Sequence, residues 1–205
     1  MGRKNLGEER RAQILDAFYR CAARDGLHGA SIRKIAAEAG VRPGIIHHYF
    51  SSREEMIEEL VVGIAELHTA EFRKSLGSAK SPKTRYERAV DFLFGPELLG
   101  DETGSMFYDF WAEAKRNEKV RKSFSRVYRG FRETIIDLLS ETGMADDLKR
   151  SEVKDLASVI IAIYEGVYLQ WDMDRDNVPL SRIKKLARKM IEGYMGGGAA
   201  GGGEK

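Results

Sequence analysis

Apolar residues recur along this chain at intervals of three and four, which is the spacing of amphipathic helices. No stretch of any length alternates apolar and polar residues as a half-buried strand does. Residues 8–25 illustrate the pattern, and Gly26 directly afterwards suits the position that follows a helix end. The apolar face of this segment consists of Ile14, Leu15, Phe18, Cys21 and Ala22. The pattern predicts an all-α fold of about nine helices.

Two short helices are predicted next. Ser31 is a good N-cap for the first of them, Gly40 suits its end, and Pro43 suits the first position of the second. The short glycine-containing turn "AGVR" joins the pair, which therefore has the proportions of a helix-turn-helix unit. We expect the second helix to enter the major groove of DNA. The inner faces that lock the pair together are formed by Ile32, Ile35, Ala36, Val41, Ile46 and Phe50.

Longer amphipathic helices are predicted for the rest of the chain. The segment near residues 53–75 is the direct covalent link between the N-terminal helices and the body, so we expect it to act as a lever between them. Its apolar face consists of Met56, Leu60, Ile64 and Leu67. Ser81 and Pro82 mark the start of a further helix. More helices are expected over residues 102–116, 118–140, 151–172 and 180–195.

This pattern divides the chain into three parts. We expect a helix-turn-helix DNA-binding domain over residues 1–52 and a helical bundle for effector binding and dimerisation over residues 53–195. The tail over residues 196–205, "GGGAAGGGEK", is of low complexity, and we expect it to be flexible.

The charge is uneven, although the net charge of the 205-residue chain is only +2. Residues 1–55 carry ten Lys or Arg and seven Asp or Glu, so this part is modestly basic, as a nucleic-acid contact at one end would require. Cys21 is the lone cysteine, which rules out an internal disulfide and favours a reducing, cytoplasmic location. We expect no signal peptide and no membrane contact, because the N-terminus is polar and no run of about 18 apolar residues occurs.

The outer surface of the helix-turn-helix offers groups that suit DNA. Pro43 and Gly44 keep the helix start slim, which permits a close approach to the duplex, and Ile45 suits a thymine methyl group. Arg33 suits the edge of a guanine. Hydroxyl and cationic side chains around the helix are expected to contact phosphates and set the register. The predicted DNA-binding residues are Ser31, Arg33, Arg42, Pro43, Gly44, Ile45, His47, His48, Tyr49 and Arg53.

The stretch "ASIRKIAAEAGVRPGIIHHYFSSREEMIEEL" resembles the N-terminal domain of TetR-family transcriptional regulators. These domains typically carry the pattern T/S-x-x-x-I-A-x-x-A-G-V-S-x-G-x-L-Y-x-Y-F-x-S-K-E-x-L, and the match covers roughly residues 10–60. The resemblance implies a homodimeric DNA-binding regulator, usually a repressor, whose C-terminal domain binds a small effector. It also implies that Ser31, Tyr49 and Arg53 contact phosphates.

Three positions depart from the family pattern. His47 stands where tyrosine is usual, Ile45 where a small hydroxyl residue is common, and Arg42 where serine is usual. We therefore expect an operator that differs from familiar ones. His47 and His48 are adjacent and point about 100° apart on a helix, whereas a zinc pair needs positions i and i+4 on one face. We expect no metal and no cofactor, and the alternative to a DNA-facing role is a pair of solvated surface histidines.

Aromatic residues in the body are candidates for an effector site, because ligand pockets are mostly apolar with a few placed polar groups. Asp109, Glu113 and Glu165 are the candidate polar groups, and a carboxylate among tyrosines at Glu165 would suit a cationic ligand. Plain core packing is the alternative for each residue, and Glu165 could instead pair with an arginine across a dimer. We predict a small, largely hydrophobic effector that contacts Phe107, Phe110, Trp111, Tyr128, Tyr164, Glu165 and Tyr168.

The last two predicted helices are candidates for the dimer interface. The stretch "LASVIIAIYEGVYL" is apolar on more than one stripe, and such a helix needs a second partner. A two-fold dimer would bind a pseudo-palindromic operator. Two other classes of protein remain open. One is a helical enzyme, which we do not expect because no phosphate loop, metal-ligand spacing or nucleophile motif occurs. The other is a DNA-binding dimer that takes no effector.

Overall fold

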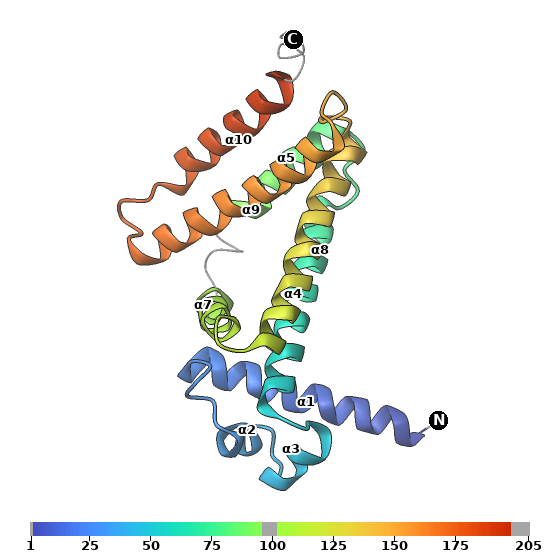
Figure 1. The fold of residues 1–205 in the computed structure, drawn as a ribbon, viewed down its shortest axis with the longest axis vertical. Helices are drawn as coiled ribbons and strands as arrows, with labels where there is room; N and C mark the ends of the chain where they lie inside the picture. Colours follow the sequence, from blue (N-terminus) through green and yellow to red (C-terminus); the bar gives the residue numbers. More distant parts are fainter. Residues whose placement is uncertain (1, 96–101, 198–205) are drawn as a thin grey trace. The chain divides into compact units, whose positions relative to one another are not determined.

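A computed structural model describes residues 2–95 and 102–197 of the chain, with side chains over residues 6–95 and 106–196 (Figure 1). Within these residues the regular structure is entirely α-helical, as the sequence predicts. The nine helices found there are α1 (Gly2–Asp25), α2 (Ile32–Glu38), α3 (Pro43–Tyr49), α4 (Arg53–Leu76), α5 (Pro82–Leu93), α7 (Glu102–Ala114), α8 (Glu118–Thr142), α9 (Arg150–Met173) and α10 (Leu180–Gly197).

The helices form two compact units. The first unit consists of Met1–His68 and Asp101–Val127, and the second consists of Thr69–Gly100 and Tyr128–Lys205. Two helices, α4 and α8, begin in the first unit and end in the second. The first unit therefore contains more than the helix-turn-helix, because α7 and the first parts of α4 and α8 pack with it.

Local signals in the sequence set the ends of the first three helices. Gly26 and Gly40 follow α1 and α2 with φ values of +73° and +65°, a left-handed conformation that glycine adopts without strain. The hydroxyl of Ser31 accepts a hydrogen bond from the Lys34 amide at 3.3 Å and caps α2. Pro43 is the first residue of α3. Each of these four positions was predicted from the sequence.

The core of the first unit is built from the predicted apolar faces. Its fully buried large side chains come from every helix of the unit and include Ile14, Phe18, Ile35, Ile46, Phe50, Met56, Met106, Phe110 and Val120. Leu67 was predicted to share the inner face of α4, and this prediction is wrong because its side chain is 65 % exposed. Leu67 lies one turn beyond buried Ile64, next to the end of the first unit at His68. Helical periodicity identifies a face but does not say how far along the helix the packing extends.

The second unit packs α5, α9 and α10 with the later parts of α4 and α8. Ser81 caps α5, since its hydroxyl accepts a hydrogen bond from the Thr84 amide at 3.0 Å. Helix α9 lies beside α10, as Figure 1 shows. The buried core includes Tyr86, Val90, Leu139, Leu156, Ala157, Ile160, Ala187 and Ile191. The glycine-rich tail was predicted from residue 196; α10 extends to Gly197, and residues 198–205 lie outside the described residues.

None of the helices in the described part of the chain combines the length and the apolar character that a membrane-spanning segment requires.

Candidate DNA-binding surface and effector site

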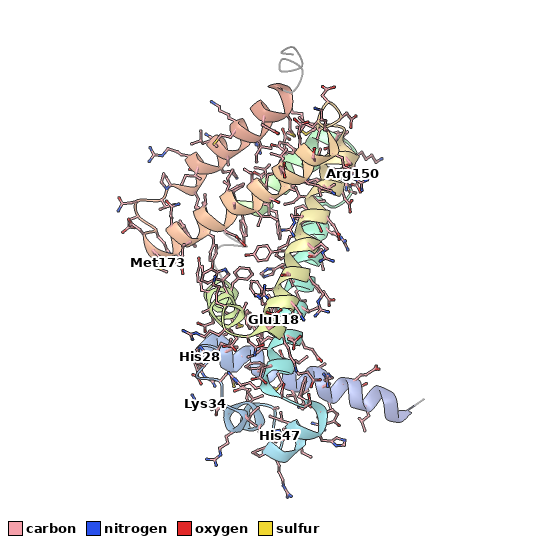
Figure 2. The ribbon with its side chains drawn as sticks, viewed as in Figure 1. His28, Lys34, His47, Glu118, Arg150 and Met173 are labelled. Atoms are coloured by element: carbon pink, nitrogen blue, oxygen red, sulfur yellow. The ribbon has the colours of Figure 1, made fainter. Side chains whose placement is uncertain are left out.

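Helix α3 has one buried face and one exposed face. Ile46 and Phe50 are 1 % and 2 % exposed and fix the helix against the rest of the first unit. The opposite side meets solvent, and His47 projects from it (Figure 2). Tyr49 is half-buried, and its ring packs edge-on against that of His48 with centroids 5.2 Å apart. The exposed residues at and before α3 are Arg42, Pro43, Gly44, Ile45, His47 and His48, all of which belong to the predicted DNA-binding set.

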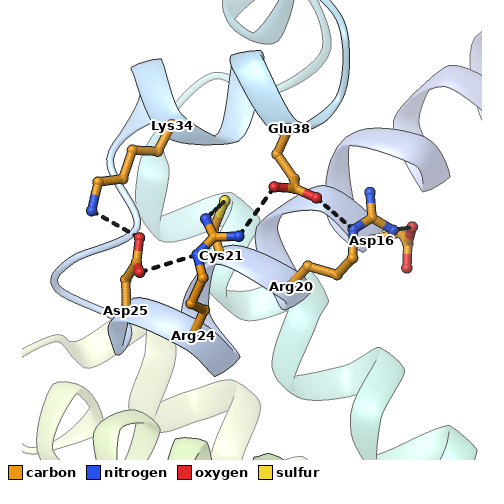
Figure 3. A network of polar contacts seen from close by, with 7 residues as sticks. All are labelled: Asp16, Arg20, Cys21, Arg24, Asp25, Lys34 and Glu38. Atoms are coloured by element: carbon orange, nitrogen blue, oxygen red, sulfur yellow. Dashed lines mark hydrogen bonds and ion pairs between the residues drawn. The ribbon is translucent and has the colours of Figure 1, made fainter.

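Four of the eight described Lys and Arg side chains in residues 6–55 pair with acids of the same unit. Arg20 and Arg24 of α1 both donate to Glu38 of α2, at 2.9 and 3.3 Å, and Lys34 lies 2.8 Å from Asp25 (Figure 3). The two arginines hold the pKa of the Glu38 carboxyl below its usual range. Single exposed ion pairs contribute little to stability. Here they bridge α1 and α2 and neutralise three of the cations.

Cys21 lies fully buried beside this network, with the Arg24 guanidinium 3.7 Å from its sulfur (Figure 3). Burial raises the pKa of the Cys21 thiol, which disfavours the reactive thiolate. Cys21 is therefore a small core residue, and its environment does not favour a role as a nucleophile.

Arg33 and Arg42 differ from the other cations of residues 6–55, the part of the chain that we call the DNA-binding head. Among the Lys and Arg side chains that the structure describes between residues 6 and 55, only these two form no hydrogen bond or ion pair within the chain. Both are exposed, Arg33 on α2 and Arg42 directly before α3. They are thus free to contact an anionic partner without breaking an existing interaction.

The environment of Arg53 differs from the sequence-based expectation of a phosphate contact. Its guanidinium donates to the carbonyl oxygens of Ala30, at 2.6 Å, and of Leu27, and it lies over the Phe18 ring, 5.4 Å from the centroid. The side chain is half-buried, and burial lowers the pKa of the guanidinium. Two charge-assisted bonds would have to break before Arg53 reached a phosphate, so we leave it out of the DNA-contacting set.

Sequence reasoning missed Arg11, which connects α1 to the end of α3. The guanidinium lies 2.6 Å from Glu55, also pairs with Glu59, and donates to the carbonyl oxygen of Tyr49. It also lies over the Phe50 ring, 4.1 Å from the centroid. The acids at positions 55 and 59 share one face of α4 at i, i+4 spacing, and this spacing was the available signal for a shared cation.

The predicted effector residues fall into both units. In the second unit, the Tyr128 hydroxyl of α8 donates to the Glu165 carboxylate of α9 at 2.5 Å. The rings of Tyr164 and Tyr168 lie 6.4 Å apart on the same helix. Burial raises the pKa of Glu165, whereas the bond from Tyr128 opposes that change. Burial and the nearby carboxylate raise the pKa of Tyr128. The structure thus brings a half-buried acid together with tyrosines.

The remaining predicted effector residues lie on α7 in the first unit. Phe110 is 2 % exposed and belongs to the core, and the Phe107 ring packs 5.1 Å from that of Phe124. Trp111 is exposed, with the Lys115 ammonium 5.5 Å from its ring centroid. Asp109, a candidate polar group of the effector site, instead accepts a hydrogen bond from the Leu27 amide at 2.7 Å. An effector contact by these α7 residues stays a prediction.

An exposed apolar face runs along α9 and α10. On α9 it contains exposed Val159, Ala162, Leu169 and Met173 and half-buried Gly166, spaced alternately by three and four residues. Leu186, Met190 and Gly193 repeat this spacing on α10, and Tyr194 lies beside them. The spacing is that of the contact stripe between helices packed nearly parallel or antiparallel.

Comparison with known proteins identifies the class of protein. The family model described as "Bacterial regulatory proteins, tetR family" matches residues 14–60, and "BetI-type transcriptional repressor, C-terminal" matches residues 82–196. The chain is 23% identical over 186 residues to the HTH-type transcriptional regulator BetI of Rhizobium meliloti, covering 91% of this chain and 89% of the relative.

Solved structures show the same fold. A putative transcriptional regulator of Pseudomonas aeruginosa PAO1 matches with a TM-score of 0.80 and 20% identity, over 94% of each chain. A putative regulator of Saccharomonospora viridis, solved in complex with choline, matches with a TM-score of 0.74 and 24% identity, over 90% of this chain and 96% of that one. The chain is therefore a helix-turn-helix transcriptional regulator. It belongs to the TetR family, with a C-terminal region of the BetI type.

The two free arginines should have different roles in operator binding. Replacing Arg42 by Ala is expected to weaken binding to all duplexes alike and to reduce the slope of log affinity against log salt by about 1, because a phosphate contact is lost. Replacing Arg33 by Ala should instead relax the preference at one base position, roughly 10-fold or more. Duplex-library binding profiles of each variant at several salt concentrations measure both effects.

Lys34→Ala is the matched control, because Lys34 is exposed beside Arg33 but already pairs with Asp25. It should change neither profile by more than about 2-fold, since an exposed pair contributes little. A uniform loss in the Arg33 variant would make that residue a phosphate contact instead.

Proposed function

We propose that the chain is a homodimeric repressor that binds a pseudo-palindromic operator and is released by a small cationic effector. The observation that carries the DNA-binding part is the exposed face of α3, together with two exposed arginines that have no partner within the chain, Arg33 on α2 and Arg42 directly before α3. The proposed contacts are Ser31, Arg33, Arg42, Pro43, Gly44, Ile45, His47, His48 and Tyr49.

A homodimer is supported by the apolar face of α9 and α10. Met173, Leu186 and Met190 are 70 %, 58 % and 56 % exposed in one chain. Two helices from each of two copies would form a four-helix arrangement with the usual near-parallel crossing. The backbone at Gly166 and Gly193 is open on this side, since a Cβ built there meets no described atom within 4 Å apart from its chain neighbours and the backbone of its own helix. Partner helices could therefore approach closely. The two-fold axis would pair two copies of α3 with two half-sites.

A cationic effector is supported by the environment of Glu165. A carboxylate among aromatic rings attracts an ammonium group by charge and through the ring faces. The half-buried acid has a raised pKa, so it is less stable as an anion than in water, and a bound cation would relieve that cost. The Saccharomonospora viridis structure contains choline, whose quaternary ammonium has this chemistry. We therefore propose an ammonium ligand contacted by Tyr128, Tyr164, Glu165 and Tyr168.

The charge of the ligand is tested with choline and its neutral carbon isostere, 3,3-dimethylbutan-1-ol, in thermal denaturation of the dimer. Choline at about 100 times its dissociation constant should raise the melting temperature by roughly 5–10 °C, and the isostere should have no comparable effect. Glu165→Gln should abolish the choline shift. Equal stabilisation by both compounds, or by a long-chain acyl compound alone, would instead support the largely hydrophobic effector considered above.

The raised pKa of Glu165 gives two further expectations. Because burial raises the folded pKa of Glu165 above its unfolded value, the folded protein loses stability as pH rises through that interval, and above it the ionised Glu165 destabilises the free protein. Glu165→Gln should therefore melt at a higher temperature than the wild type without ligand. Choline affinity should fall as pH decreases through the raised pKa, because the protonated acid carries no charge. Glu66→Gln on α4 serves as the control at an exposed acid.

A further inference from the structure

The segment between α1 and α2 is held by side chains from two other helices. At the end of α2, the amide after the terminal glycine closes its own helix, since Val41 N–H donates to the Ala36 carbonyl at 2.9 Å. At the end of α1, the equivalent amide, Leu27 N–H, donates to the Asp109 carboxylate of α7 at 2.7 Å. The segment between α1 and α2 therefore depends on a residue of α7 that lies 82 positions further along the chain.

The carbonyl side of the same residue is held as well. Arg53, the first residue of α4, donates to the carbonyl oxygens of Leu27 and Ala30. Glu113 lies one helical turn after Asp109 on α7, and its charge acts favourably on the Arg53 guanidinium. The peptide groups on both sides of Leu27 are thus fixed by an acid of α7 and a base of α4. Charge-assisted hydrogen bonds of this kind are about twice as strong as neutral ones.

Asp109 lies between two buried residues of α7. Met106 and Phe110 of α7, at 1 % and 2 % exposed, anchor the helix in the core of the first unit on either side of Asp109, and α7 packs against α1 (Figure 1). Gly26 lies so close that a Cβ there would be 3.3 Å from a carboxylate oxygen of Asp109. A shift of α7 would therefore move the acceptor of the Leu27 amide. Ser31, the N-cap of α2, lies only four residues after Leu27, so the start of α2 would be affected.

We propose that Asp109 is a positioning residue for operator binding, which sets the placement of α2 and α3 through the Leu27 amide. It touches no DNA itself. Asp109 would hold in place the helices that carry the proposed DNA contacts, and this role rests on the proposed binding to an operator. It also gives α7 a role beside α4, because α4 alone was expected from the sequence to act on the head.

The test uses the full-length dimer and three readouts on each variant: exchange of the Leu27 amide by NMR, affinity for a duplex selected with the wild type, and the melting temperature. Asp109→Ala should exchange the Leu27 amide at least 10-fold faster and bind the duplex about 10-fold more weakly. Asp109→Asn retains an acceptor oxygen and should recover most of both losses. Glu118→Ala, which removes an exposed acid at the start of α8, should change neither.

The outcomes separate a positioning role from a purely structural one. Faster Leu27 exchange with wild-type duplex affinity in Asp109→Ala would overturn the proposal, and so would unchanged exchange. If Asp109→Ala does not fold, Asp109→Glu decides in the same way, because the longer acid moves the acceptor oxygen. If the wild type itself binds no duplex, the operator proposal fails, while the exchange data still report separately whether Asp109 holds the Leu27 amide.

Discussion

Leu186→Asp is expected to turn the dimer into a monomer and to reduce operator affinity by about 100-fold or more. Leu186 belongs to the exposed stripe on α10, one turn before Met190, and is 58 % exposed in the single chain. An interface of this kind buries such side chains, and an unpaired carboxylate placed there would lose its hydration. A monomer contacts one half-site only, and the gain from binding two linked half-sites together disappears.

Leu67→Asp is the matched control for this variant. It introduces the same charge at a leucine that is 65 % exposed, on α4 rather than on α9 or α10. Light scattering gives the mass of each variant, and a duplex titration gives its affinity. A dimeric Leu186→Asp protein with unchanged affinity would place the dimer interface on another surface. Loss of the dimer in both variants would show that the effect of the added charge is not specific to the stripe on α9 and α10.

Arg11→Ala is expected to lower the free energy of unfolding by about 2 kcal/mol, which is a decrease of roughly 4–8 °C in melting temperature. The substitution leaves Glu55 and Glu59 without their shared cation and the Tyr49 carbonyl without its donor. Arg10→Ala is the control, because the neighbouring arginine bonds only to Gln13 among the described residues, at 2.7 Å. It should change stability by no more than about 0.5 kcal/mol.

The same network sets a dependence on pH. Ser51 and Arg11 both donate to Glu55 and lower its pKa from 4.5 to about 2. An acid with a lowered folded pKa contributes stability above its unfolded pKa, and this contribution is lost as pH falls from about 4.5 toward 2. In Arg11→Ala, stability should therefore be lower at neutral pH and should fall less over this interval. An identical acid profile in the variant would show that Arg11 does not stabilise the ionised acid.

The N-terminal helices were predictable because their signals are local. Ser31, Gly40 and Pro43 act on their own helix ends, and each lies where the sequence placed it. Interactions between distant segments were not predictable in this way. Arg53 follows the pattern of a phosphate contact, yet its partners are carbonyl groups more than 20 residues earlier, at separations of 23 and 26 residues. Neither composition nor periodicity indicates a contact between residues that lie so far apart in the sequence.

The effector residues show the same limit. Glu165 and Tyr128 were both candidates, but only the packing of α8 on α9 brings the hydroxyl to the carboxylate. Asp109 was a candidate for the same site because it lies among aromatic residues in the sequence, and its side chain instead turns to the Leu27 amide. A helix has several faces, and the sequence does not state which neighbour each face meets. The exposed stripe of α9 and α10, in contrast, can be recognised from the spacing of its apolar residues once the bounds and inner faces of both helices are known.

Selection of bound sequences from random duplexes, followed by titration of the recovered site in salt, tests the central claim most directly. A homodimer that binds through α3 should recover a site with two-fold symmetry whose half-sites are about one helical turn apart or a multiple of it. Its affinity should fall steeply with salt and decrease on addition of choline. Recovery of no symmetric site by ligand-free dimer, with only weak and sequence-independent binding, would contradict the account.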